Sequence, residues 1–174
     1  MPEVILLTGT NIPPKFENIV NAGDYIGSSI GDIVTTSEIF ESKPWGFVHD
    51  SSFLNQIIIC TTNFTPEELL QRCMEYETNC GRKPKQSDNY EARVIDIDIL
   101  FYDDLVYKSQ TLEVPHPRLH LRKFTLIPLC SVRGDKIHPV FSISIKELLD
   151  QCEDTENPAV YLPRENESDF HGNI

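Results

Sequence analysis

The sequence predicts an α+β fold of the ferredoxin-like split βαβ type, a mainly antiparallel sheet with helices packed on it. The first observation is the order of the inferred elements, strand, helix, strand, strand, helix, strand, which is the order of that motif. The second is periodicity, because apolar residues alternate or form short runs in the strands and recur every three or four positions in the helices. The third is length, since 174 residues without an internal repeat or low-complexity linker suit one domain.

The first half of the chain supplies the first helix and three strands. Short apolar runs bounded by turn residues indicate the strands. Two prolines precede apolar residues at helical spacing, which is typical of a helix start. The expected elements are a strand at 4–8, a helix opened by Pro13 and Pro14 and ended at 27–31, and strands at 33–40 and 53–61.

Two further helices carry clear start signals. Thr65 and Glu68 form a capping box around a proline at the first helical position, and Gly81 is a suitable end. A second capping box at 144–147 predicts a short helix to Cys152. The remaining expected features are a polar loop at 82–92, a strand at 93–101, a hairpin turn at 103–104 and a short segment at 124–129.

The strand at 93–101 carries two carboxylates. Because side chains alternate between faces, Asp96 and Asp98 are expected on one face, and the apolar residues Ile95, Ile97, Ile99 and Phe101 on the other. Oxygen ligands on a rigid strand suit Mg²⁺, which usually reaches proteins together with substrate phosphates. The same alternation is typical of any half-solvated antiparallel strand, so this pattern alone leaves both interpretations open.

Charge and composition restrict the function. A formal net charge of -12 disfavours nucleic-acid binding, which needs a basic face. The segment 82–123 is nevertheless basic, as expected for a small anionic ligand. No apolar run reaches membrane-spanning length, and no secretory signal is visible, so a cytoplasmic protein that does not bind membranes is expected. Five cysteines without close Cys-x-x-Cys spacing predict free thiols.

The predicted domain covers residues 1–152. Residues 153–174 are polar and acidic and lack a core pattern. They are therefore expected to form a loosely attached acidic C-terminal tail.

Several segments together carry a resemblance. They are Gly9-Thr10-Asn11, Lys43-Pro44-Trp45-Gly46, Phe53-Leu54-Asn55, Glu77 with Gly81-Arg82, the run from Arg93 to Leu100, Pro115-His116-Pro117-Arg118, and Arg122-Lys123-Phe124 leading to Pro128-Leu129. In this order and spacing, over roughly the first 140 residues, the chain resembles the 6-hydroxymethyl-7,8-dihydropterin pyrophosphokinases of folate synthesis. The resemblance implies transfer of pyrophosphate from ATP to the pterin hydroxymethyl group, with release of AMP.

The resemblance also assigns residues to ATP, the metal and catalysis. It implies two Mg²⁺ ions held by Asp96 and Asp98, and ATP as co-substrate. Arg82 and Arg93 match arginines that contact phosphates during transfer, a task that suits their planar charge. The remaining expected ATP-binding residues are Glu77, Ile99, His116, Arg118 and Arg122. His116 and His120 have the spacing of a zinc pair, but Pro117 lies between them and a third ligand is missing nearby.

For the pterin, the resemblance implies two stacking rings and one residue that binds the ring edge. Phe53 and Phe124 match the stacking positions. From the residues alone, plain core packing is the favoured explanation for both, and only the resemblance reverses this. Asn55 matches the edge-binding residue, since its amide both donates and accepts. Ser42, Lys43 and Trp45 match a loop beside the ring. The chain departs from the family at 88–91, where acidic residues precede Arg93.

Two alternatives remain. One is a different Mg²⁺-dependent phosphotransferase or nucleotidyltransferase that uses the same aspartates on another acceptor. The other is a ferredoxin-like binding or regulatory module without activity. Small-molecule substrates and a monomeric state are expected for the favoured reading.

Overall fold

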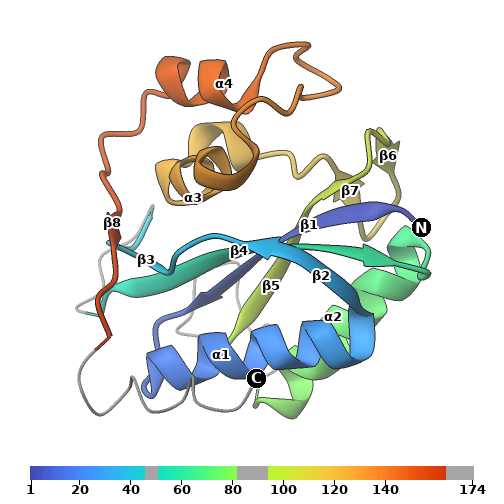
Figure 1. Ribbon diagram of the computed structural model, residues 1–174, viewed down its shortest axis with the longest axis vertical. Coiled ribbons are helices and arrows are strands. Elements are labelled where there is room, and N and C mark those ends of the chain that lie inside the picture. The colour runs from blue at the N-terminus through green and yellow to red at the C-terminus, as the bar shows by residue number, and fades with distance from the viewer. Residues whose placement is uncertain (46–50, 82–93, 164–174) are drawn as a thin grey trace.

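The computed structural model describes residues 1–45, 51–81 and 94–163, which form three layers (Figure 1). The middle layer is an antiparallel sheet with the long strands β1 (Glu3–Thr10), β4 (Phe53–Thr62) and β5 (Asp96–Tyr102). One face is covered by α1 (Lys15–Tyr25) and α2 (Pro66–Asn79), and the other by α3 (Lys123–Arg133) and α4 (Ile145–Gln151).

The sheet has the topology that the sequence predicts. β1 lies between β4 and β5 and is antiparallel to both. On its other side, β4 pairs first with β2 (Gly31–Thr36) and then with β3 (Phe40–Ser42). The order β5-β1-β4 followed by β2 and β3 is that of a split βαβ sheet, so the predicted ferredoxin-like α+β class is confirmed.

The predicted helix starts are confirmed at both capping boxes. Thr65 Oγ1 accepts from the Glu68 N–H, and the Glu68 carboxylate accepts from the Thr65 N–H over 2.8 Å. Ser144 and Glu147 make the same reciprocal bonds at the start of α4. Glycine 81 has a φ of 97°, a left-handed conformation that suits the residue after a helix.

The two faces of the sheet bury separate cores. The core against α1 and α2 contains Val4 and Leu6 of β1 with Ile58 of β4. The core against α3 and α4 contains the alternate residues Ile5 and Ile57. Because both faces of the central strands are buried, their sequences are nearly continuous apolar runs.

A β-bulge in β5 corrects one prediction. The pairing shifts so that Ile5 faces Phe101 while the next residue of β1, Leu6, faces Ile99. Leu100 is therefore the extra residue, and Phe101 joins the α3 and α4 core instead of sharing a face with Ile99. The expectation that Phe101 points with the three isoleucines is wrong, because a single inserted residue reverses the alternation after it.

Other boundaries also differ from the expectations. The strand expected at 33–40 is interrupted, because Ser37 bonds to both backbone groups of Ile57 and separates β2 from β3. The first helix continues as a π-helical turn, η1 (Ile26–Ile30), before β2 begins. The segment expected at 124–129 is the longer helix α3, which tolerates Pro128 within it.

The turn at 103–104 is present, but it does not form the expected hairpin. After it, β6 (Tyr107–Lys108) pairs with β7 (Glu113–Val114) in a separate small sheet and not with β5. A short 3-10 helix, η2 (Leu119–Leu121), then leads into α3. The expected loop at 82–92 lies outside the described residues.

Residues 153–163 are attached to the domain, contrary to the expectation of a loose tail. They pass from α4 along the edge of the sheet, where β8 (Ala159–Val160) pairs with β3. An acidic segment without an apolar period gives no sequence signal for such an attachment, because backbone and carboxylate hydrogen bonds form it. Residues 164–174 lie outside the described part, and the division of the chain at residue 152 stays a prediction.

The helices within the described ranges are all too short or too polar to cross a lipid bilayer. The five cysteines are free thiols, as expected. Burial raises the pKa of Cys60 to about 11 and that of Cys73 to about 12, so both thiols stay protonated and unreactive near neutral pH.

Candidate active site

A polar row crosses the sheet on the face that α3 covers. Asn55 of β4, Gly9 of β1 and Asp96 of β5 are paired in register, so their Cα atoms form one line across three strands. The next row on the same face contains Ile57, Leu7 and Asp98. The face is therefore polar around the first row and becomes apolar toward the core beneath α3 and α4.

The two aspartates lie as the sequence predicts. Asp96 and Asp98 are half-buried and alternate with Ile95, Ile97 and Ile99, which are buried in the opposite core. Both carboxylates therefore start from the same face of a strand that is fixed by its pairing with β1. The side chain of Ile99 belongs to the opposite face, so it is directed away from the aspartates.

Gly9 keeps the middle of the polar row flat. A Cβ atom at this position would approach Asn55 Oδ1 to 3.1 Å. Gly9 therefore adds no side chain to the row between Asn55 and Asp96. The sequence predicts that this strand ends at residue 8, whereas β1 continues through Gly9 to Thr10.

The expected pterin-edge residue is buried and oriented. Asn55 is 3% exposed, and its Nδ2 donates to Ser42 Oγ over 2.9 Å. This bond defines which end of the amide points toward Gly9. Ser42 pairs with Phe53 at the start of β4, and Lys43 follows directly. Sequence alternation thus brings Phe53 and Asn55 to the same face of the sheet.

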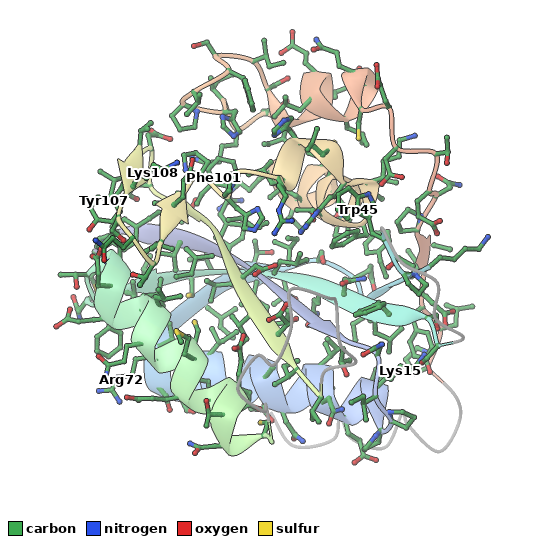
Figure 2. The ribbon with its side chains drawn as sticks, turned by 180° about the vertical axis from the view of Figure 1, so that it is seen from behind. Lys15, Trp45, Arg72, Phe101, Tyr107 and Lys108 are labelled. Carbon is green, nitrogen blue, oxygen red and sulfur yellow. The ribbon has the colours of Figure 1, made fainter. Side chains whose placement is uncertain are left out.

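The start of α3 lies over this end of the sheet. Arg122 is 4% exposed, and its guanidinium carbon lies 4.6 Å from the centre of the Trp45 ring and 5.5 Å from that of Phe124. Figure 2 shows Trp45 beside α3, above the sheet. The structure therefore brings together one residue expected at the nucleotide and two expected at the pterin. A guanidinium between two rings is held by cation–π attraction, which fixes its position.

His116 lies within the charged surroundings of this site. Burial, together with the positive charges of Arg122 and Arg118, lowers its pKa to about 4, although Asp96 acts in the opposite direction. His116 is therefore neutral near pH 7. Its Nδ1 accepts from the Arg118 N–H over 3.2 Å, which leaves the other ring nitrogen as the donor.

Glu77 differs from the exposed helical glutamate that its sequence context suggests. It is 2% exposed, and its Oε1 accepts from the Ile97 N–H over 2.7 Å. Ile97 lies between Asp96 and Asp98, so α2 holds the peptide that separates the two carboxylates. No sequence pattern predicts this bond, because helical periodicity gives the face of a residue but not its partner.

A divalent cation fits these residues. Within residues 1–45, 51–81 and 94–163, no group of three or more His, Cys, Asp or Glu side chains forms a complete metal site. Two carboxylates on one strand face are what Mg²⁺ needs when phosphates and water supply its other ligands. The expected catalytic residues Arg82 and Arg93 lie outside the described residues.

Comparisons with known proteins identify the family. The sequence pattern of 7,8-dihydro-6-hydroxymethylpterin-pyrophosphokinase matches residues 5–134 of this chain. The chain belongs to this family. Within it, the 2-amino-4-hydroxy-6-hydroxymethyldihydropteridine pyrophosphokinase of Aquifex aeolicus is 35% identical over 147 residues, which cover 84% of this chain and 90% of that protein.

Other relatives contain the pyrophosphokinase as part of a longer chain. The folic acid synthesis protein FOL1 of Dictyostelium discoideum is 34% identical over 83% of this chain but only 22% of its own length. A crystal structure of Plasmodium falciparum HPPK-DHPS superposes with a TM-score of 0.71 at 16% identity, covering 86% of this chain and 43% of that one. The chain thus spans less than half of that protein, and the superposition shows the shared fold.

Membership in the pyrophosphokinase family establishes the reaction. The chain transfers pyrophosphate from ATP to the hydroxymethyl group of 6-hydroxymethyl-7,8-dihydropterin and releases AMP, a step in folate biosynthesis. The resemblance on which the sequence prediction depended is confirmed. The assignment of individual site residues remains a prediction.

Proposed function

We propose that Asp96 and Asp98 hold the triphosphate of ATP through two Mg²⁺ ions on the α3 face of the sheet. The position of both carboxylates on one face of a paired strand supports this assignment and is the single observation on which it depends most. When bound, Mg²⁺ neutralises phosphate charge and lowers the pKa of a nearby hydroxyl. The bond from Glu77 to Ile97 keeps the spacing of the two carboxylates fixed.

The acceptor occupies the other end of the same polar row. Asn55 binds the edge of the pterin ring, and Gly9 leaves room for the flat ring between Asn55 and the aspartates. Phe53 and Phe124 stack on its two sides, one from the sheet and one from α3. Ser42, Lys43 and Trp45 line the adjoining segment.

Charge on the nucleotide is matched by the basic residues at the start of α3. Arg118 and Arg122 bind phosphate or ribose oxygens, and neutral His116 donates one hydrogen bond. Arg82 and Arg93 contact the phosphates from the adjacent segment of the chain. The pterin hydroxyl oxygen then bonds to the β-phosphorus, the bond from that phosphorus to the α,β-bridging oxygen breaks, AMP leaves, and the hydroxyl proton passes to solvent.

Replacing either aspartate tests this assignment. We expect Asp96→Asn and Asp98→Asn to lower AMP release from ATP and hydroxymethyldihydropterin by about a thousandfold, because each removes negative charge at the cation site. The measurement is AMP formation by chromatography over a Mg²⁺ titration. Asp32→Asn, which removes an exposed carboxylate from β2, is the matched control and should retain wild-type turnover.

Calorimetry separates this proposal from the alternatives. With a non-hydrolysable ATP analogue and Mg²⁺ present, wild-type protein should bind the pterin tightly, and Mg²⁺ removal should abolish nucleotide binding. A phosphotransferase for another acceptor would bind the analogue but not the pterin. Wild-type activity in both aspartate variants would contradict the cation assignment.

We further propose a monomeric, cytoplasmic enzyme. Light scattering would test the monomeric state, and cell fractionation would test the location.

A further inference from the structure

Residues 153–163, here termed the C-terminal strap, connect the two helical layers across one edge of the sheet. Figure 1 shows the strap descending from α4 past α3 to β3, where β8 extends the sheet. The family pattern ends at residue 134, so the strap lies beyond the span that it matches. Exposure alternates along it: Asp154 and Glu156 are half-buried, whereas Glu153, Thr155 and Asn157 are exposed.

Asp154 caps α3. Its Oδ2 accepts from the Lys123 N–H over 2.9 Å, and its Oδ1 accepts from the Glu156 N–H over 3.0 Å. Arg122 is the N-cap residue of α3 but makes no side-chain capping bond of its own. A helix start favours a nearby carboxylate, and here the strap supplies it. The N–H group that it binds belongs to Lys123, the residue between Arg122 and Phe124.

Glu156 binds the segment that follows β3, a second part of the proposed acceptor site. Its Oε1 accepts from the Lys43 N–H over 3.1 Å. Lys43 follows Ser42, whose hydroxyl orients Asn55, and precedes the segment that contains Trp45. Glu156, two residues after Asp154, thus ties the strap to the segment that begins at Lys43, the second element proposed to surround the pterin.

The lower end of the strap is anchored independently of these carboxylates. Val160 and Ala159 pair with Phe40 and Glu41, and the Tyr161 N–H donates to Ile39 O over 2.8 Å. The Tyr161 ring lies 6.2 Å from that of Phe16 of α1. Loss of one carboxylate therefore leaves the strap attached, while the element that it held is released.

We propose that Asp154 and Glu156 are positioning residues for the pterin acceptor. They tie the start of α3, with Arg122 and Phe124, and the segment after β3, with Lys43 and Trp45, to one continuous strap, and so fix the spacing between the two. This inference rests on the proposed acceptor site. It assigns the acidic segment a role in substrate binding through the backbone amides of Lys43 and Lys123.

Steady-state kinetics of single variants tests the inference. In Asp154→Ala and Glu156→Ala, we expect the KM for hydroxymethyldihydropterin to rise about tenfold. The reason is that each variant loses a hydrogen bond to a charged group. The KM for ATP should change less than twofold in Glu156→Ala, which leaves the bond to the start of α3 in place. In Asp154→Ala it should rise, but less than the KM for the pterin, because Arg122 is the one proposed nucleotide residue on the released helix start. Glu153→Ala removes an equivalent exposed charge and should leave both KM values unchanged.

Conservative variants separate positioning from general loss of structure. Glu156→Gln keeps the one acceptor oxygen that the Lys43 N–H uses and should recover most of the pterin affinity, whereas a pure charge effect predicts no recovery. Asp154→Asn keeps only one of the two acceptor oxygens that the Lys123 and Glu156 N–H groups use, so it should recover the affinity only in part. An unchanged pterin KM in the folded alanine variants, or parallel increases in both KM values, would overturn the inference. If an alanine variant does not fold, Glu156→Gln and Glu156→Asp are compared instead. A pterin KM near wild type in Glu156→Gln, which keeps the acceptor oxygen, together with a raised KM in Glu156→Asp, which is one methylene shorter, supports the hydrogen-bond role. Equal pterin KM values in these two variants overturn it. An unchanged pterin KM in Asn55→Ala would instead refute the proposed acceptor site itself, whatever the strap variants show.

Discussion

At position 9, the absence of a side chain is what the proposed site requires. A Cβ there would lie 3.1 Å from Asn55 Oδ1, closer than ordinary contact, so Gly9→Ala must displace the Asn55 amide by a few tenths of an ångström. Because that amide is proposed to bind the pterin edge, we expect the pterin KM to rise by roughly tenfold, with unfolding free energy lowered by about 1 kcal/mol or less. Pterin titrations and thermal unfolding measure the two effects.

Gly23 provides a matched control for Gly9. A Cβ at Gly23, within α1, would meet only Ile58 Cδ1 at 3.8 Å, which is ordinary contact. Gly23→Ala should therefore stabilise the protein by about 0.5–1 kcal/mol through helix propensity and leave both KM values unchanged. Equal pterin affinities in the two alanine variants would contradict the role of Gly9.

At this scale, the sequence could predict residue types but not their partners. Alternation was sufficient to put Asp96 and Asp98 on one face, because that pattern depends only on the geometry of a strand. It could not show that Glu77 is buried against the backbone of Ile97, or that Arg122 lies between two aromatic rings. Those contacts join residues far apart in the chain, and only the packing of the layers brings them together.

Among the elements, α2 and β5 are coupled by one buried carboxylate. Glu77→Ala leaves the Ile97 N–H without this acceptor, so we expect an unfolding free energy lower by about 1.5–3 kcal/mol. Urea denaturation measures the loss. Glu75→Ala removes an exposed glutamate from the same helix and should cost less than about 0.5 kcal/mol. A similar small loss in both variants would show that the bond to β5 contributes little.

The elements were predictable where local chemistry defines them. Both capping boxes predicted helix starts because the bonds that form them lie within four residues. The bulge at Leu100 and the break at Ser37 were not predictable, since each depends on how one strand pairs with another. The strap was missed for the same reason, because its anchors on β3 and α3 are distant in sequence.

For the whole molecule, buried histidines make stability depend on pH. His138 is 3% exposed between α3 and α4, against the rings of Phe101 and Phe141. Burial lowers its pKa to about 4, with smaller contributions from His120 and Lys136. In the unfolded chain the pKa returns to about 6.5, so between these values the unfolded state binds a proton that the native state does not. Stability therefore falls as pH is lowered through this window.

The carboxylates of the capping boxes titrate in a lower range, which isolates the histidine effect. Hydrogen bonds from Thr65 and Ser144 lower the pKa of Glu68 and Glu147, so both remain charged at pH 5. Because the pKa values of His138 and His116 are both about 4, we expect each to account for a loss of about 2 kcal/mol from pH 7 to pH 5. His138→Asn keeps an acceptor at the Nδ1 position for the Val140 N–H but cannot titrate. Urea denaturation at pH 7 should show a lower unfolding free energy for this variant than for wild type, because the ring contacts are lost. Between pH 7 and pH 5, the variant should lose about 2 kcal/mol less unfolding free energy than wild type does. Parallel curves for the variant and the wild type would mean that His138 is protonated in the native state.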